Sequence, residues 1–134
     1  MKKFNIFRQK KEKNNSEQNA NSAVEWPKYV VELDKKHFQE FIEKYPLSIV
    51  DFWASWCAPC KAMAPRLRRL SNIYKGKVAF GKLNTQENPD ITKNYKILGI
   101  PHLIAFRHGE KISSITGLKS VGDIKNVIEG FLKK

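Results

Sequence analysis

The chain has 134 residues, 41% of them hydrophobic, which is enough for one folded domain whose core needs no disulfide framework. Its formal net charge is +12, but the basic residues are scattered without interleaved aromatics, so a solvated basic surface is favoured over a nucleic-acid interface. No apolar run approaches the roughly 20 residues of a membrane-spanning helix, and the basic start lacks the apolar segment of a secretory signal. We therefore expect a cytoplasmic protein.

Residues 1–25 differ in composition from the rest of the chain. They hold five asparagines and six basic residues and show almost no apolar periodicity. Such a segment cannot bury enough surface to offset the entropy lost on ordering. We predict a disordered basic N-terminal extension at 1–25 and a folded domain at 26–134.

The first half of the folded domain reads as strand, helix and strand. A short strand is expected at 29–33. Apolar residues then recur at helical spacing after Asp34, a good helix cap, and Pro46 ends that helix. The nearly continuous apolar run at 47–54 is typical of a central strand buried on both faces.

The second half predicts three helices and three strands. Residues 57–74, 88–97 and 120–134 have helical patterns, and 77–84 reads as a second central strand. Residues 102–117 predict a β-hairpin that turns at a His-Gly pair. The alternation of strands and helices predicts an α/β fold, with a mixed central sheet and helices on both of its faces.

The only two cysteines, Cys57 and Cys60, stand two residues apart. Zinc would need further ligands, and His102 and His108 bracket an apolar strand that separates them by roughly 20 Å. A structural staple is also a poor explanation, because a bridge between these cysteines closes a tiny loop that restricts the unfolded chain little. No metal site is expected, and a reactive pair is favoured.

Helix geometry supports that reactive pair. If Cys57 begins the helix at 57–74, the Cα atoms of the two cysteines lie about 5 Å apart, within the range that a disulfide permits. The helix N-terminus favours a thiolate, so the pKa of Cys57 should fall, and Pro59 fits an early helical position. We expect an exposed attacking Cys57 and a shielded Cys60.

Two further residues are candidates for roles near this pair. Asp51 is the only charge in 47–54, so burial should raise its pKa and allow it to exchange a proton beneath the cysteines. An edge-strand aspartate facing water is the alternative. Pro101 precedes an apolar strand, and the pattern alone does not indicate a cis bond there.

Four segments resemble the thioredoxin family: "VDFWASWCAPCK", "KLNTQENP", "GIPHLIAFRHGE" and "TGL". The resemblance covers nearly all of residues 26–134. It implies the thioredoxin fold, a central five-stranded mixed β-sheet flanked by four α-helices. It also implies a redox-active Cys57–Cys60 disulfide, in which Cys57 attacks a substrate disulfide and Cys60 resolves the mixed disulfide.

The resemblance assigns roles to the residues around the pair. Asp51 would accept and donate the proton of Cys60, and Lys82 would tune Asp51. Ile100 would pair its backbone with the substrate, and Pro101 would be cis. The substrate-binding residues implied are Trp56, Ala58, Pro59, Ile100, Pro101 and Gly117.

The implied activity is general cytosolic protein-disulfide reduction by a monomer. The resemblance implies no bound cofactor, electrons from NADPH through a thioredoxin reductase, and disulfide-containing proteins as substrates. Alternatives are an oxidant or isomerase of the same fold, and a binding module in which the thiols are incidental.

Three positions depart from the family's usual pattern. Ala58 stands where glycine is commonest, and Gln86 replaces a commonly acidic residue. His102 follows the proline where threonine is usual, and we expect its side chain to face solvent at the start of the strand.

Overall fold

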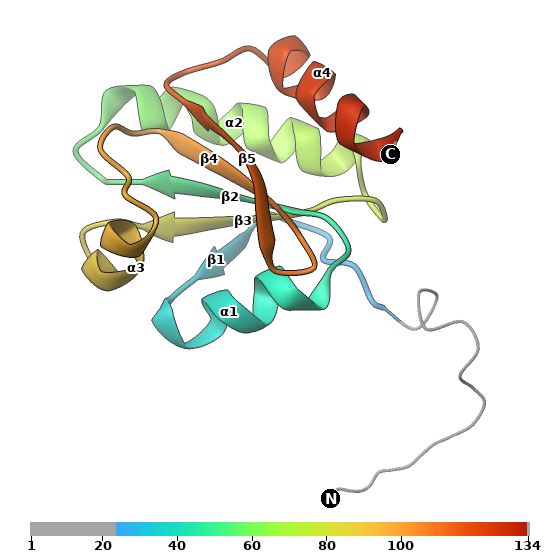
Figure 1. The fold of residues 1–134 in the computed structure, drawn as a ribbon. Helices are drawn as coiled ribbons and strands as arrows, with labels where there is room; N and C mark the ends of the chain where they lie inside the picture. The colour runs from blue at the N-terminus through green and yellow to red at the C-terminus, as the bar shows by residue number, and fades with distance from the viewer. Residues whose placement is uncertain (1–23, 134) are drawn as a thin grey trace, which may run out of the picture.

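The computed structural model describes residues 24–133. Within that range the chain forms a five-stranded mixed sheet with helices against both faces (Figure 1), so the predicted fold class is confirmed. The extension predicted at 1–25 lies outside the described residues, apart from its last two positions. No helix among the described residues is long and apolar enough to cross a membrane.

The strands and helices follow one another much as the sequence predicts. In chain order the elements are β1 (Val31–Leu33), α1 (Lys35–Lys44), β2 (Ser48–Trp53), α2 (Ala58–Ile73), β3 (Ala79–Asn84), α3 (Pro89–Asn94), β4 (His102–Arg107), β5 (Glu110–Thr116) and α4 (Val121–Leu132). The strand order across the sheet is β1-β3-β2-β4-β5. Strand β3 is parallel to both β1 and β2, whereas β4 is antiparallel to β2 and β5.

Local sequence signals explain several of these boundaries. The Asp34 side chain accepts a hydrogen bond from the His37 backbone N–H and so caps α1 as predicted. Ser120 caps α4 in the same way. The hairpin turns at His108 and Gly109, whose φ angles of 48° and 88° match the left-handed backbone that tight two-residue hairpins require.

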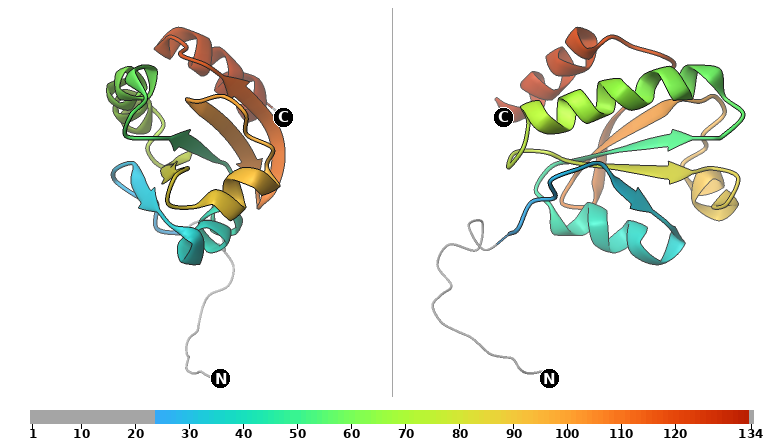
Figure 2. Two further views of the ribbon diagram at one scale, coloured as in Figure 1. Left: turned by 90° about the vertical axis from the view of Figure 1, so that its left-hand side faces the viewer. Right: turned by 180° about the vertical axis from the view of Figure 1, so that it is seen from behind.

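The helices divide the core into two layers. Helices α2 and α4 cover one face of the sheet, and α1 and α3 cover the other (Figures 1 and 2). The α1/α3 face is rich in aromatic rings, whereas the α2/α4 face is mainly aliphatic. Rings in edge contact on the first face are Phe38, Phe52, Tyr95 and Phe106.

Strand β2 positions the two cysteines. It is the middle strand of the sheet, and nearly all of it is buried, as expected for a strand covered on both faces. Its carboxyl end leads through a short loop into α2, so the start of α2 lies beside the end of the central strand. This junction brings Cys57, Cys60 and Asp51 into one region.

Candidate active site

Cys57 and Cys60 form a disulfide at the start of α2. Their Cα atoms are 5.3 Å apart, close to the separation that helix geometry predicts. Cys57 is the cap residue rather than the first helical residue, and its Sγ accepts a hydrogen bond from the Cys60 backbone N–H at 3.2 Å. This N–H is one of the free donors of a helix N-terminus, so it would also stabilise a Cys57 thiolate.

The expected contrast between an exposed Cys57 and a shielded Cys60 is wrong for the disulfide form. Both residues are 4% exposed. The two cysteines form a buried cluster with Ala54, and Trp53 and Ile100 pack against that cluster. Access to the sulfur atoms therefore depends on the rim around them rather than on their own exposure.

That rim includes the loop between α3 and β4. The Ile100–Pro101 peptide bond is cis, and the Ile100 carbonyl oxygen lies 3.8 Å from Cys57 Sγ. Gly117 N–H donates to the Pro101 carbonyl at 2.8 Å, with a φ of 93° that favours glycine. Trp56, 67% exposed, precedes Cys57 directly. These contacts bring the Pro101 and Gly117 loops together next to the disulfide.

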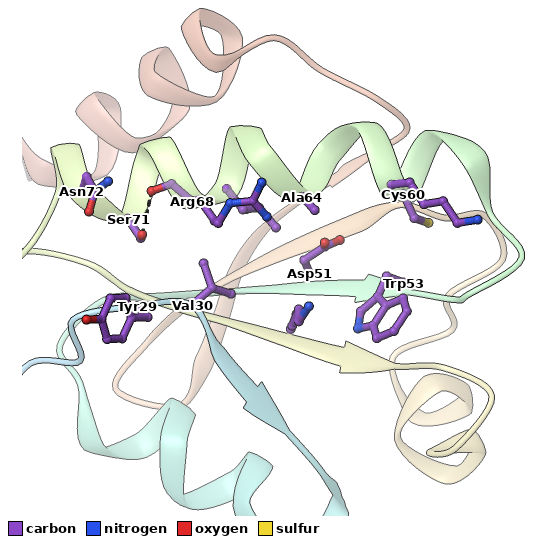
Figure 3. Close-up of a pocket in the computed structure, with 12 residues that line it drawn as sticks. Tyr29, Val30, Asp51, Trp53, Cys60, Ala64, Arg68, Ser71 and Asn72 are labelled. Carbon is purple, nitrogen blue, oxygen red and sulfur yellow. Dashed lines mark hydrogen bonds between the residues drawn. The ribbon is translucent and has the colours of Figure 1, made fainter.

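Asp51 lies in the middle of β2 and is 2% exposed, which excludes the water-facing alternative. Burial raises the pKa of its carboxyl to about 7, and the nearby Lys82 charge opposes that rise. Its Oδ1 atom has no hydrogen-bond partner among the described residues. The carboxyl group projects from β2 toward α2 (Figure 3).

Lys82 stands opposite Asp51 in the paired strand β3. Its Nζ atom is 3.5 Å from a Glu32 carboxylate oxygen and 5.1 Å from the centre of the Trp53 ring. Glu32 and Trp53 therefore also interact with the Lys82 ammonium group whose charge acts on Asp51. Trp53 was given no role in the sequence analysis, although its position two residues after Asp51 places both side chains on the same face of β2.

The expectation that His102 faces solvent is wrong. His102 is only 9% exposed, because β4 is paired on both sides and its first residue is already inside the sheet. Its Nδ1 atom is 2.8 Å from Thr116 Oγ1, and its ring meets Phe52 edge-on. Burial, with a smaller effect of Lys111, lowers the pKa of His102.

A groove of about 500 Å³ opens between α2 and the sheet (Figure 3). Both Asp51 and Cys60 line it, although no direct hydrogen bond joins them. The groove was not predicted, since it depends on the space left between side chains of α2 and those before β1. It gives water a path to the Asp51 carboxyl group and to Cys60.

The family model for thioredoxin matches residues 29–130. The chain belongs to the thioredoxin family. Like its relatives it is a thiol–disulfide oxidoreductase, with Cys57 and Cys60 as its redox-active pair. No group of three or more potential metal-ligating side chains of His, Cys, Asp or Glu gathers within residues 24–133.

Curated relatives and solved structures agree with this family. The chain is 36% identical to thioredoxin of Staphylococcus saprophyticus over 103 residues, 77% of this chain and 98% of that protein. It is 39% identical to thioredoxin M-type, chloroplastic, of Spinacia oleracea over 111 residues, 82% of this chain but 61% of the spinach protein. A mutant thioredoxin from Halobacterium salinarum shares the fold, with a TM-score of 0.73, 24% identity, and coverage of 79% of this chain and 93% of that one.

Proposed function

We propose that this thioredoxin-family chain is a general reductant of protein disulfides in the cytosol. The observation that carries the proposal is the position of Cys57, which caps α2 and accepts the Cys60 N–H at its sulfur. A thiolate held there is both stabilised and next to the rim formed by the Pro101 loop. Cys60 is one helix turn away, close enough to close the disulfide without moving the backbone.

The proposed reaction has two exchange steps. The Cys57 thiolate attacks one sulfur of the substrate disulfide, which forms a mixed disulfide and releases the other substrate sulfur as a thiolate. Cys60 then loses its proton and attacks the Cys57 sulfur, which releases the second substrate sulfur. The substrate gains two electrons and two protons, and the chain is left with the Cys57–Cys60 disulfide.

We assign the proton of Cys60 to Asp51. The carboxyl group and Cys60 line the same groove, which leaves room for a water molecule to connect them. The raised pKa, about 7, allows Asp51 to accept and return a proton near neutral pH. Lys82, across the β2–β3 pairing, tunes this carboxyl through its charge.

Substrates would bind over the rim beside the disulfide. The Ile100 backbone would pair with an extended substrate segment next to Cys57, in the manner of an added strand. The side chains and backbone that would form this surface are Trp56, Ala58, Pro59, Pro101 and Gly117. Leu98, which the sequence reasoning did not single out, is 99% exposed in the same loop and adds an apolar contact.

After each reaction the Cys57–Cys60 disulfide must be reduced again by an outside source of two electrons. Family chemistry uses the thiol pair itself and needs no bound cofactor, so the oxidised chain must take its electrons from another molecule. We propose NADPH, through a thioredoxin reductase, as that source, and a monomer as the working form. The cytosolic assignment is also ours, since the name of the spinach relative places that protein in the chloroplast.

The replacement Cys60→Ser tests the two-step mechanism. It removes the resolving sulfur. Incubation with insulin whose disulfides are intact should therefore leave a stable mixed disulfide through Cys57, which dithiothreitol releases. The matched control is Cys57→Ser, in which the remaining Cys60 faces the groove rather than the Pro101 loop and should trap little. Equal trapping by both variants would show that the assigned roles are wrong.

The redox potential separates a reductant from an oxidant of the same fold. A reductant should equilibrate with glutathione at a potential at or below the glutathione couple of the cytosol. A Cys57–Cys60 potential well above that couple would overturn the proposed direction of electron flow.

A further inference from the structure

The groove behind the disulfide extends well beyond Asp51. It follows one face of α2 from Cys60 to Asn72, a length of about 18 Å by helix geometry. The opposite wall comes from Tyr29 and Val30 before β1 and from the adjoining faces of β2 and β3 (Figure 3). Its volume of about 500 Å³ is in the range that small ligands occupy in proteins.

The walls of this groove are mainly apolar. Val30, Trp53, Ala64 and Leu67 line it and are only partly or not at all exposed. A ligand with a hydrocarbon or aromatic body would remove this apolar surface from water, which favours binding. A purely polar metabolite would gain little from these walls.

Cations surround the apolar walls. Lys61, Arg68 and Lys82 all line the groove. Among residues 24–133, Lys61 and Arg68 make no ion pair, and Lys82 is paired with the largely exposed Glu32. The single acid of the lining, Asp51, is buried, and much of it is protonated near neutral pH. The accessible charge of the groove is therefore positive.

Two buried polar atoms of the lining lack partners among the described residues. They are Asp51 Oδ1 and Trp53 Nε1. Buried polar atoms are nearly always hydrogen-bonded, so these two indicate a place where water or a ligand's polar group completes the site. Both atoms belong to β2, and Figure 3 shows Trp53 nearer Cys60 and Asp51 farther along the groove, near Ala64.

We propose that this groove binds a small amphiphilic organic anion, whose apolar body lies between Leu67 and Val30 and whose acid group contacts Arg68 or Lys61. A bound ligand would cover Asp51 and Cys60 from water and so slow thiol–disulfide exchange. Residues 1–23 are a poor occupant, because they carry six Lys or Arg and two Glu and so have the same sign of charge as the groove.

Binding is tested on the full chain with octanoate as the probe, by amide and indole NMR shifts. We expect saturable shifts at Val30, Ala64 and the Trp53 indole. Arg68→Gln should weaken binding by about fivefold, the effect of losing one exposed charge contact. The matched control is Arg69→Gln, which removes an equal charge from an exposed neighbour that does not line the groove. A second variant, Ala64→Phe, fills the groove and should also weaken binding.

Three outcomes would overturn the site. They are the absence of saturation, equal weakening by Arg68→Gln and Arg69→Gln, and equal binding of octylamine, which has the same chain length but the opposite charge. The last two would indicate general attraction to a basic surface or simple apolar partitioning.

The kinetic consequence rests on the proposed function and is measured separately. Dithiothreitol reduces the Cys57–Cys60 disulfide to two thiols and is itself oxidised to a cyclic disulfide, and tryptophan fluorescence follows the change. Saturating octanoate should slow this reaction several-fold in the parent chain and much less in Arg68→Gln. Binding without slowing would overturn the regulatory effect, whereas a chain that dithiothreitol cannot cycle would contradict the proposed function itself.

Discussion

The two faces of the sheet are covered by different kinds of side chain. On the α1/α3 face, aromatic rings pack edge to face, with centroids less than 7 Å apart around Phe38. On the α2/α4 face, aliphatic side chains pack around a groove, an acid with a raised pKa and two unpartnered polar atoms. The α2/α4 face therefore holds the groove and the acid beside the disulfide, whereas the α1/α3 face is built mainly from aromatic contacts. Each face also holds two buried polar atoms without partners among the described residues, and on the α1/α3 face these are Ser48 Oγ and His102 Nε2.

The largest expected effect tests the α1/α3 face. Phe38→Ala removes a ring that contacts Phe52, Tyr95 and Phe106, and it should lower the free energy of unfolding by about 3–5 kcal/mol. Urea unfolding of the oxidised chain measures the loss. The rate of disulfide reduction in the folded chain should change little, and a loss of reactivity as large as the loss of stability would show that the two faces are not separable.

The second prediction concerns Asp51 on the other face. Its pKa is raised in the folded chain, so the folded state holds a proton that the unfolded state has lost between about pH 4 and pH 7. Stability therefore falls as the pH rises through that window. At pH 8, Asp51→Asn should raise the free energy of unfolding, measured by urea, by about 1.4 kcal/mol for each unit by which burial raises the Asp51 pKa. At pH 4 the variant should show no such gain.

The same variant should react more slowly. Asn cannot accept a proton, so the resolving step at Cys60 should slow above pH 7, and the inflection near that pH should disappear from the rate profile. Stopped-flow reduction of insulin across pH 5 to 9 measures both. A gain in stability with an unchanged rate profile would leave Asp51 as a structural cost without a proton-transfer role.

A smaller effect is expected at Lys82. Its charge opposes the rise in the pKa of Asp51, so Lys82→Met should raise that pKa further and move the midpoint of the rate profile to higher pH. The pKa can be followed through the Asp51 carboxyl carbon by NMR. The control Lys93→Met removes a charge from the exposed surface of α3 and should leave the midpoint in place.

The smallest effect is expected where the aromatic face meets the site. Thr116→Val removes the hydroxyl that is 2.8 Å from His102 Nδ1 and should cost about 1–2 kcal/mol by leaving that nitrogen without a partner. Because burial lowers the pKa of His102, folding stability should fall as the pH drops below about 6.5. His102→Gln should remove that part of the acid sensitivity, and an unchanged profile would contradict the assignment.

The sequence predicted well those features that depend on local pattern. The apolar run at 47–54 identified the central strand, Asp34 and Pro46 bounded α1, and the His108–Gly109 pair gave the hairpin turn. The spacing of Cys57 and Cys60 gave their Cα separation within a few tenths of an ångström. These features depend on residues that are close together in the sequence, so the sequence pattern is enough to predict them.

The features that were missed depend on side chains from distant segments. Cys57 is buried because Ile100, 43 residues later, packs on it, and His102 is buried because β5 and β2 flank its strand. The groove depends on the space left between Leu67 of α2 and Val30, 37 residues earlier in the chain. The sequence pattern of one segment does not show which distant side chains will contact it. Side-chain exposure was therefore predicted less well than secondary structure.

The position of β2 in the sheet has a consequence for protein synthesis. The strand pairs with β3 on one side and with β4 on the other, and both are made after it. We therefore expect the burial of Asp51 to be incomplete until His102–Arg107 has left the ribosome. A nascent chain that stalls before that point already carries both thiols. It lacks the complete sheet, so we expect both cysteines to be open to oxidation before the fold that buries them is finished.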